Sequence, residues 1–155
     1  MLRLSKLSDY AMVIMAYLAK HPRQICSAKK VASQTGIALP TVSKLLKHLA
    51  NHQLLTAQRG VQGGYQLALP AHAISLATII HALDGSLALT ECSQGQPHCV
   101  VENRCMIRHN WRRISAFVQA TLQQISLAEL IRPLHLTDRL ITDRLKKPLT
   151  VIEKS

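Results

Sequence analysis

Residues 27–51 read SAKKVASQTGIALPTVSKLLKHLAN, and this stretch decides the fold that the sequence predicts. Ser27 is a typical N-cap for a short helix over residues 28–35, and Gly36 supplies its stop. Pro40 falls where the first turn of a following helix accepts proline. The apolar stripe of that second helix consists of Val42, Leu45, Leu46 and Leu49. Two short helices, the second with a basic polar face, predict a helix-turn-helix.

The segment before this helix-turn-helix, residues 10–20, is almost wholly apolar. We expect it to form a buried helix at the core of the module, with Ser8 or Asp9 as its N-cap. It does not resemble a secretory signal, because the acidic Asp9 precedes it and Lys-His-Pro follows at residues 20–22 in place of a small-residue cleavage site. We therefore expect a cytoplasmic protein.

The segment after the helix-turn-helix predicts a wing. Residues 54–57 and 65–69 read as two short strands, the second with alternating apolar residues. The hairpin tip between them, residues 58–64, is rich in glycine and carries one arginine, Arg59. Glycine lets the backbone approach a partner closely, and an arginine on such a tip suits a narrow minor groove.

The positive charge of the chain is concentrated in this module. The chain has 155 residues and a formal net charge of +11. Residues 1–73 carry +8, with Asp9 as their only acid, whereas residues 74–131 are neutral and residues 132–155 carry +3. A concentrated positive half indicates a polyanionic partner, and nucleic acid before membrane.

The expected partner is double-stranded DNA. The chain holds only 3 Tyr, 1 Trp and 1 Phe, which is too few for the base-stacking surfaces of RNA and single-strand binders. No apolar stretch approaches the roughly 18 residues that span a bilayer, so no membrane contact is expected. The candidate DNA-binding residues are Lys29, Pro40, Thr41, Ser43, Lys44 and Lys47 in the helix-turn-helix, and Arg59, Gly60, Gly63 and Gly64 in the wing.

A loop in the neutral half contains Cys92, Cys99 and Cys105, with the spacing C-x6-C-x5-C. Three thiolates that can converge form a soft-ligand metal site. Structural zinc usually uses close cysteine pairs, so the wide spacing suits a larger iron–sulfur cluster better. Three cysteines would leave one iron position to a weaker oxygen or nitrogen ligand. A zinc site completed by histidine and three buried free thiols are the alternatives, and the fourth cysteine, Cys26, reads as a buried thiol.

A long helix follows the last of these cysteines. Its apolar residues recur at intervals of four and three, the pattern of a seam between two helices: Ile107, Trp111, Ile114, Val118, Thr121 and Ile125. We expect a homodimer through this seam, the alternative being a helix packed on its own domain. The predicted fold class is mainly α with a small β-wing. The expected organisation is a winged helix-turn-helix domain (1–73), a cluster-binding loop with a dimerisation helix (74–131) and a basic C-terminal tail (132–155).

Four features together resemble the IscR/NsrR family of iron–sulfur transcription regulators. They are the opening MLRLSKLSDYA (1–11), the wing RGVQGGY (59–65), the helix end LDG (83–85) and the three cysteines before a long helix. The opening is most similar to regulators of the SUF iron–sulfur assembly operon in proteobacteria. The resemblance covers about residues 1–131.

The resemblance implies a homodimeric repressor whose cluster, 2Fe-2S or 4Fe-4S, controls binding to operator DNA. Its expected targets are genes of iron–sulfur assembly or of redox and nitric-oxide stress, and no small-molecule substrate is expected. Such a protein is cytoplasmic, and nucleoid-associated when bound to DNA.

The fourth cluster ligand differs within the family that this sequence resembles. Where it is a histidine, it lies three residues after the last cysteine, a position occupied here by Arg108, with His109 one residue further. In NsrR-like members an aspartate near the chain start comes from the other subunit, and Asp9 matches it. Asp9 is therefore the preferred candidate, ahead of His109, Glu102 and His98.

Two other classes compete with this interpretation. A zinc-stabilised DNA-binding regulator would keep the basic module without redox sensing. An iron–sulfur electron carrier would need the cluster but no DNA-binding surface. An enzyme is not expected, because the sequence shows no nucleophile–base pair, paired carboxylates or phosphate-binding loop.

Overall fold

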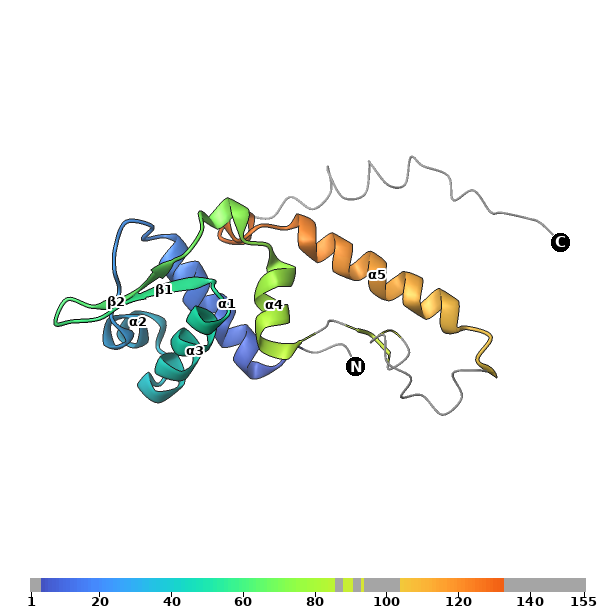
Figure 1. Ribbon diagram of the computed structural model, residues 1–155, viewed down its shortest axis with the longest axis horizontal. Coiled ribbons are helices and arrows are strands. Elements are labelled where there is room, and N and C mark those ends of the chain that lie inside the picture. Colours follow the sequence, from blue (N-terminus) through green and yellow to red (C-terminus); the bar gives the residue numbers. More distant parts are fainter. Residues whose placement is uncertain (1–3, 86–87, 91–92, 94–103, 133–155) are drawn as a thin grey trace.

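The computed structural model describes residues 4–85, 88–90, 93 and 104–132. These form a mainly helical body with one small antiparallel sheet (Figure 1), as the sequence predicts. In chain order the elements are α1 (Lys6–Ala19), α2 (Ala28–Thr35), α3 (Leu39–Asn51), β1 (Leu55–Gln58), β2 (Gly64–Leu67), the 3-10 turn η1 (Ala71–Ala73), α4 (Leu76–Asp84), α5 (Arg108–Gln124) and α6 (Leu127–Leu130). No helix in the described part of the chain is long and apolar enough to cross a membrane.

The predicted local signals of the helix-turn-helix are confirmed. The Ser27 hydroxyl accepts a hydrogen bond of 3.2 Å from the backbone amide of Lys30, and so caps α2. Gly36 ends that helix with φ of 71°, in the left-handed region that glycine adopts without a steric penalty. Pro40 lies in the first turn of α3. The four predicted stripe residues of α3 are all buried.

The N-cap predicted for α1 is wrong. The cap is Ser5, whose backbone is extended and whose hydroxyl accepts the Ser8 amide at 3.1 Å. Asp9 donates its own amide to the carbonyl of Ser5 at 3.1 Å, so it lies inside the first turns of the helix. The helix therefore begins four residues earlier than the apolar segment that the sequence singles out.

The wing is a two-stranded antiparallel sheet in which Leu55 pairs with Leu67 and Gln58 with Gly64. Both strands lie within a residue or two of their predicted positions. The predicted alternation of the second strand is not seen in its burial, because all four residues of β2 are half-buried. A second, isolated backbone bridge lies next to this strand, and through it the wing is joined to the segment between α1 and α2.

The hydrophobic core gathers side chains from both halves of the chain. Ile14 and Met15 of α1 are fully buried, which confirms that this helix lies at the centre. α2 contributes Val31 and α3 contributes its stripe. Ile79 of α4 and Leu127 of α6 belong to the same cluster. Burial of this apolar surface is the main force that holds α4 and α6 against the helix-turn-helix.

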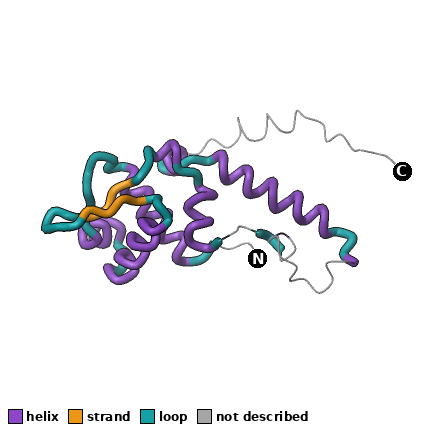
Figure 2. The backbone as a smooth tube through the Cα atoms, in the orientation of Figure 1, coloured by secondary structure: helices purple, strands orange, loops and turns teal. Residues whose placement is uncertain are grey.

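The long helix α5 extends away from this body and is attached to it at its C-terminal end (Figure 2). The amide of Leu76 donates to the carbonyl of Ile125, and the amide of Leu127 donates to the carbonyl of Ile74, both at 2.8 Å. Ile107 and Ile125, predicted as seam residues inside the helix, are its N-cap and C-cap residues. The helix ends at Ile125, whose backbone is extended and whose carbonyl accepts the hydrogen bond from Leu76 at the start of α4.

Candidate nucleic-acid interface and cysteine loop

The exposed face of α3 carries the basic residues that the sequence predicts for DNA contact. Pro40, Ser43, Lys44 and Lys47 are exposed, and Lys29 is exposed on α2. Thr41 is half-buried, since it lies on the flank of α3 that faces α1. No residue between positions 10 and 83 is acidic, so the segment that forms this surface supplies no carboxylate of its own to neutralise the lysines.

At the wing, the structure separates the predicted residues into two groups. Arg59 and Gly60 are exposed, and Gly60 has φ of 113°. Gly63 and Gly64 are half-buried, and each has a structural reason to be glycine. A Cβ at Gly63 would lie 2.4 Å from the Gln58 carbonyl oxygen, and a Cβ at Gly64 would lie 2.5 Å from the Cys26 carbonyl oxygen. The tip residues Arg59 and Gly60 are therefore those best placed for a partner.

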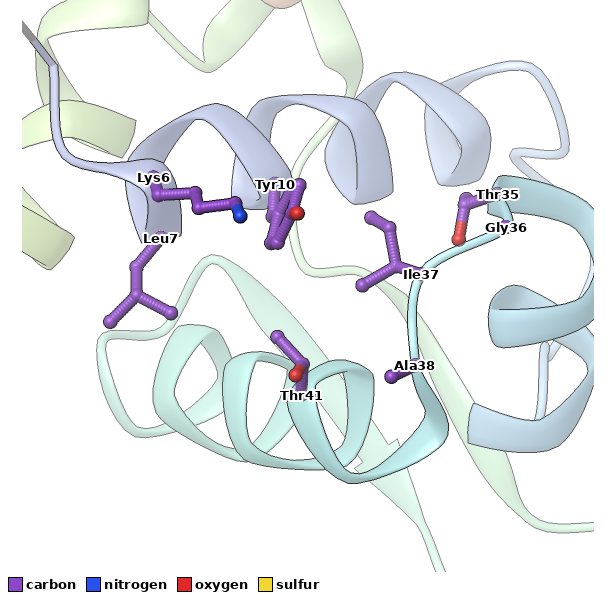
Figure 3. Close-up of a pocket in the computed structure, with 8 residues that line it drawn as sticks. All are labelled: Lys6, Leu7, Tyr10, Thr35, Gly36, Ile37, Ala38 and Thr41. Atoms are coloured by element: carbon purple, nitrogen blue, oxygen red, sulfur yellow. The ribbon is translucent and has the colours of Figure 1, made fainter.

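A hollow of about 610 Å³ lies between the first half of α1 and the start of α3 (Figure 3). The side chains of Lys6 and Tyr10 enter it from α1, and Thr41 enters from α3. The Lys6 ammonium nitrogen is 5.7 Å from the centre of the Tyr10 ring. The N-cap of α3 is Ala38, whose methyl group cannot accept a hydrogen bond from the first amides of that helix.

Sequence reasoning missed Lys6 and Tyr10 as candidate site residues. They lie more than thirty positions before Thr41, and only the packing of α1 on α3 brings the three together. The available signal was the position of Lys6 four residues before Tyr10, which places both on one face of a helix.

The three cysteines of the predicted cluster are only partly described. Cys105 is half-buried just before α5, whereas Cys92 and Cys99 lie outside the described residues. Within the described part of the chain, no three His, Cys, Asp or Glu side chains come together as a metal site. Asp9 and His109 are exposed, and Glu102 and His98 lie outside the described residues. The Asp9 carboxylate has no hydrogen-bond or ion-pair partner among the residues that the structure describes.

The segment between α4 and α5, residues 86–107, contains these three cysteines and is called the cysteine loop, and its described ends lie along one stretch of α5. The amide of Leu89 donates to the Ser115 hydroxyl at 3.2 Å. Ser115 is seven residues from the start of α5, which corresponds to about 10 Å of helix. Cys92 follows Leu89 by three residues and Cys105 precedes the helix by three, and three extended residues span about 10 Å. Cys92 and Cys105 thus lie only three residues in sequence from Leu89 and from the start of α5, and three thiolates with one oxygen or nitrogen donor are a chemically suitable set of ligands for an iron–sulfur cluster.

The C-terminal end of α4 with its C-cap Gly85, residues 82–85, is held by two other helices just before the cysteine loop. The Ser8 hydroxyl donates to the Asp84 carboxylate at 2.7 Å, and the Ser5 amide donates to the same oxygen at 3.3 Å. Burial would raise the pKa of the Asp84 carboxyl, but these hydrogen bonds outweigh it and lower the pKa below its ordinary value. From α3, the ring of His48 donates Nε2–H to the carbonyl of Ala82 at 2.8 Å.

Cys26 is fully buried, which confirms the prediction of a buried thiol. Its sulfur lies 3.8 Å from the carbonyl oxygen of Gln24. Burial, together with the neighbouring Cys26 thiol, raises the pKa of the Tyr17 hydroxyl. This cysteine belongs to the core beneath the wing and lies apart from the cysteine loop in sequence.

The predicted dimerisation helix presents an exposed apolar face. Ile107, Trp111, Ile114 and Phe117 are 56%, 37%, 46% and 52% exposed. Val118 and Thr121 are half-buried at the end of α5 that meets the body. Phe117 was not among the predicted seam residues, because it falls outside the strict alternation of four and three. An apolar face of this kind on a basic, water-exposed chain indicates a contact surface.

The chain is similar in sequence and in fold to known proteins. A family described as "Rrf2: Iron-dependent Transcriptional regulator" matches residues 4–133. The HTH-type transcriptional regulator IscR of Vibrio campbellii (strain ATCC BAA-1116) is 32% identical over 142 residues, which cover 89% of this chain and 84% of that protein. IscR of Yersinia pseudotuberculosis serotype O:1b (strain IP 31758) is 33% identical over 131 residues, which cover 84% and 79%.

Two solved structures extend this similarity to three dimensions. CymR (YrzC), described as the global cysteine regulator of B. subtilis, matches with a TM-score of 0.67 and 28% identity over 84% of this chain and 97% of that chain. T. potens IscR matches with a TM-score of 0.64 and 27% identity over 84% and 86%. The two IscR sequences are named HTH-type transcriptional regulators and CymR is named a global regulator; none of these names is that of an enzyme.

Proposed function

Because the chain belongs to the Rrf2 family of transcriptional regulators, we propose that it is an iron–sulfur-cluster-sensing repressor that binds operator DNA as a homodimer. The observation that carries this proposal is the joining of two surfaces in one fold. A basic helix-turn-helix and wing, without an acid between residues 10 and 83, are attached through α4 to a cysteine loop whose ends lie on α5. The proposed division is 1–73 for DNA binding, 74–131 for sensing and dimerisation, and 132–155 as a basic tail.

The proposed DNA contacts follow from exposure and charge. α3 would enter the major groove with Ser43, Lys44 and Lys47, and the wing would present Arg59 to the minor groove. Lys6 and Tyr10, beside Thr41 in the hollow, are added to the predicted contacts (Figure 3). A cation and two hydroxyls next to the uncapped start of α3 form a suitable contact for a backbone phosphate.

The proposed dimer uses the apolar face of α5. Pairing two such helices would remove Trp111, Ile114 and Phe117 from water. A twofold dimer would place two copies of α3 on successive major grooves, about 34–36 Å apart. A pseudo-palindromic operator is therefore expected.

Cys92, Cys99 and Cys105 would hold the cluster, 2Fe-2S or 4Fe-4S, and Asp9 of the partner subunit is the preferred fourth ligand. When bound, an iron–sulfur cluster would be held by these thiolates, and its reduction potential would depend on its ligands, on hydrogen bonds to its sulfurs and on its exposure to solvent. The exposed, unpartnered state of the Asp9 carboxylate within the described residues supports its availability for this role. The target genes would be those of iron–sulfur assembly or of redox and nitric-oxide stress, and the protein would act in the cytoplasm at the nucleoid.

The test is anaerobic purification followed by an absorption spectrum, iron and sulfide counts, and operator binding with and without the cluster. Cys105→Ser is expected to lose the visible absorbance and the cluster dependence of binding. Cys26→Ala, which removes a buried thiol outside the loop, is the matched control and is expected to keep both. Zinc in place of iron, with operator binding intact, would support a zinc-stabilised regulator, and visible absorbance without operator binding would support an electron carrier.

A further inference from the structure

The described residues contain two buried polar side chains, Ser8 and Ser115. Each is hydrogen-bonded to a residue near the start of the cysteine loop. Ser8 is 0% exposed and Ser115 is 4% exposed. Ser8 donates to Asp84, on the last turn of α4, and Ser115 accepts the amide of Leu89. Burying a hydroxyl has a cost unless it is hydrogen-bonded, so these two pairs hold the chain on either side of positions 86–87 in defined places.

The last turn of α4 is also bonded to the proposed recognition helix. The carbonyl of Ala82 is among the last four of α4 and has no amide partner in that helix. His48 of α3 donates to it at 2.8 Å, across 34 residues of sequence. His48 lies on the half-buried flank of α3, whereas Lys44 and Lys47 lie on the exposed face of the same helix. One hydrogen bond thus joins the recognition helix to the turn that leads into the cysteine loop.

We propose that His48 is the positioning residue through which the state of the cysteine loop sets the placement of α3 on DNA. The proposal rests on the proposed function. It adds a path, within one subunit, by which a change in the cysteine loop reaches α3. The path runs from the loop to residues 82–85, which Ser8 anchors on α1, and from Ala82 to His48. Packed protein interiors have low compressibility and transmit strain, so a shift of this turn is expected to reach α3.

The size of the coupling is limited by the strength of the bond. A single neutral hydrogen bond in a protein corresponds to about a 3- to 10-fold change in an equilibrium constant. Loss of the His48 bond is therefore expected to reduce the ratio between the operator affinities of the cluster-loaded and cluster-free protein by about 3- to 10-fold. Binding in the two states would become more alike.

The test compares three full-length variants. His48→Leu removes the donor and keeps an apolar side chain, and His48→Gln keeps an N–H that can reach the carbonyl. His52→Leu is the matched control, because its exposed ring lies 4.7 Å from that of His48 at the end of the same helix. The affinity ratio is expected to fall in His48→Leu, to be restored at least partly in His48→Gln, and to remain at the wild-type value in His52→Leu. A wild-type ratio in His48→Leu would overturn the proposal.

A second measurement separates this proposal from the proposed function. Amide hydrogen exchange of the cluster-free protein needs neither cluster nor operator. His48→Leu is expected to speed exchange in α3 and at residues 82–85 together, whereas His52→Leu is not. Unchanged exchange at residues 82–85 in His48→Leu overturns the role of His48. Wild-type operator affinity that does not depend on the cluster would instead contradict the proposed function.

Discussion

The hydroxyl of Ser8 donates a hydrogen bond of 2.7 Å to the carboxylate of Asp84, across 76 residues of sequence. The bond joins the first turn of α1 to the last turn of α4. It satisfies a fully buried serine and a carboxylate that also accepts the amide of Ser5. The start of α1 in the DNA-binding module is therefore hydrogen-bonded directly to the end of α4, where the cysteine loop begins.

The Asp84 carboxylate is expected to make stability depend on pH. Its pKa is lowered in the folded state, so its contribution is present above the ordinary value of 3.8 and is lost as the pH falls through the lower folded value. The free energy of unfolding of Asp84→Asn should lie below that of the wild type at pH 7, and the difference should shrink below about pH 4. Urea denaturation at several pH values measures this. In a Ser8→Ala background the pH-dependent difference should be smaller, and an equal difference in both backgrounds would show that the Ser8 bond is not responsible.

Gly64 and Arg59 are expected to affect DNA binding by different routes. Gly64→Ala places a Cβ 2.5 Å from the Cys26 carbonyl oxygen, and overpacking of this kind costs about 1–3 kcal/mol of stability. Arg59→Ala removes an exposed side chain and should leave the melting temperature within about a degree or two while weakening operator binding. Thermal melts and operator titrations of both variants distinguish the routes. If Gly64→Ala kept the wild-type melting temperature, Gly64 would be required for contact with DNA and not for the stability of the fold.

Salt dependence should reveal whether Lys6 binds a phosphate. If a dimer neutralises six to eight phosphates, log K should fall with log[salt] with a slope of about −5 to −7. Lys6→Ala should make this slope less steep by about 0.9 for each phosphate that the variant no longer neutralises. Lys20→Ala is the matched control, because Lys20 is an exposed lysine at the opposite end of α1. Equal slopes for the two variants would remove Lys6 from the interface.

Charge on the apolar face of α5 should prevent dimerisation. Ile114 is 46% exposed on this face, and a glutamate there would have to be desolvated on pairing. Ile114→Glu is expected to be a monomer by sedimentation at a concentration where the wild type is a dimer. Ala116→Glu introduces the same charge at an exposed position on the other side of the helix and should remain a dimer. A dimeric Ile114→Glu would place the interface elsewhere.

The parts of the fold that the sequence predicts are those determined by neighbouring residues. Ser27 caps the helix that follows it, Gly36 ends that helix, and the stripe of α3 is buried because its period matches the helix. The start of α1 could not be predicted in this way. Ser5, Ser8 and Asp9 are all good capping residues, and the choice of Ser5 goes with the hydrogen bonds that Asp84 accepts from Ser5 and Ser8.

In the candidate site, too, the features set by residue type and helical period could be predicted, whereas those set by packing between distant segments could not. Charge and exposure on α3 follow from residue type and helical period, so Lys44 and Lys47 could be named from the sequence. The hollow that contains Lys6 and Tyr10 depends on how α1 packs on α3, and the role of Gly64 depends on how the wing packs on Cys26. The ligation of Cys92, Cys99 and Cys105 stays a prediction, as does the contribution of Asp9.

The paired backbones of Cys26 and Tyr65 have a consequence for how an operator would be chosen. Each donates its amide to the other's carbonyl at 2.9 Å, so the base of the wing is fastened to the segment before α2. The distance between Arg59 and the exposed face of α3 is therefore expected to change little when the protein binds DNA. A sequence whose narrow minor groove already falls at that distance would bind undeformed, and others would bind only at an elastic cost. Discrimination would therefore extend to base pairs that no side chain touches.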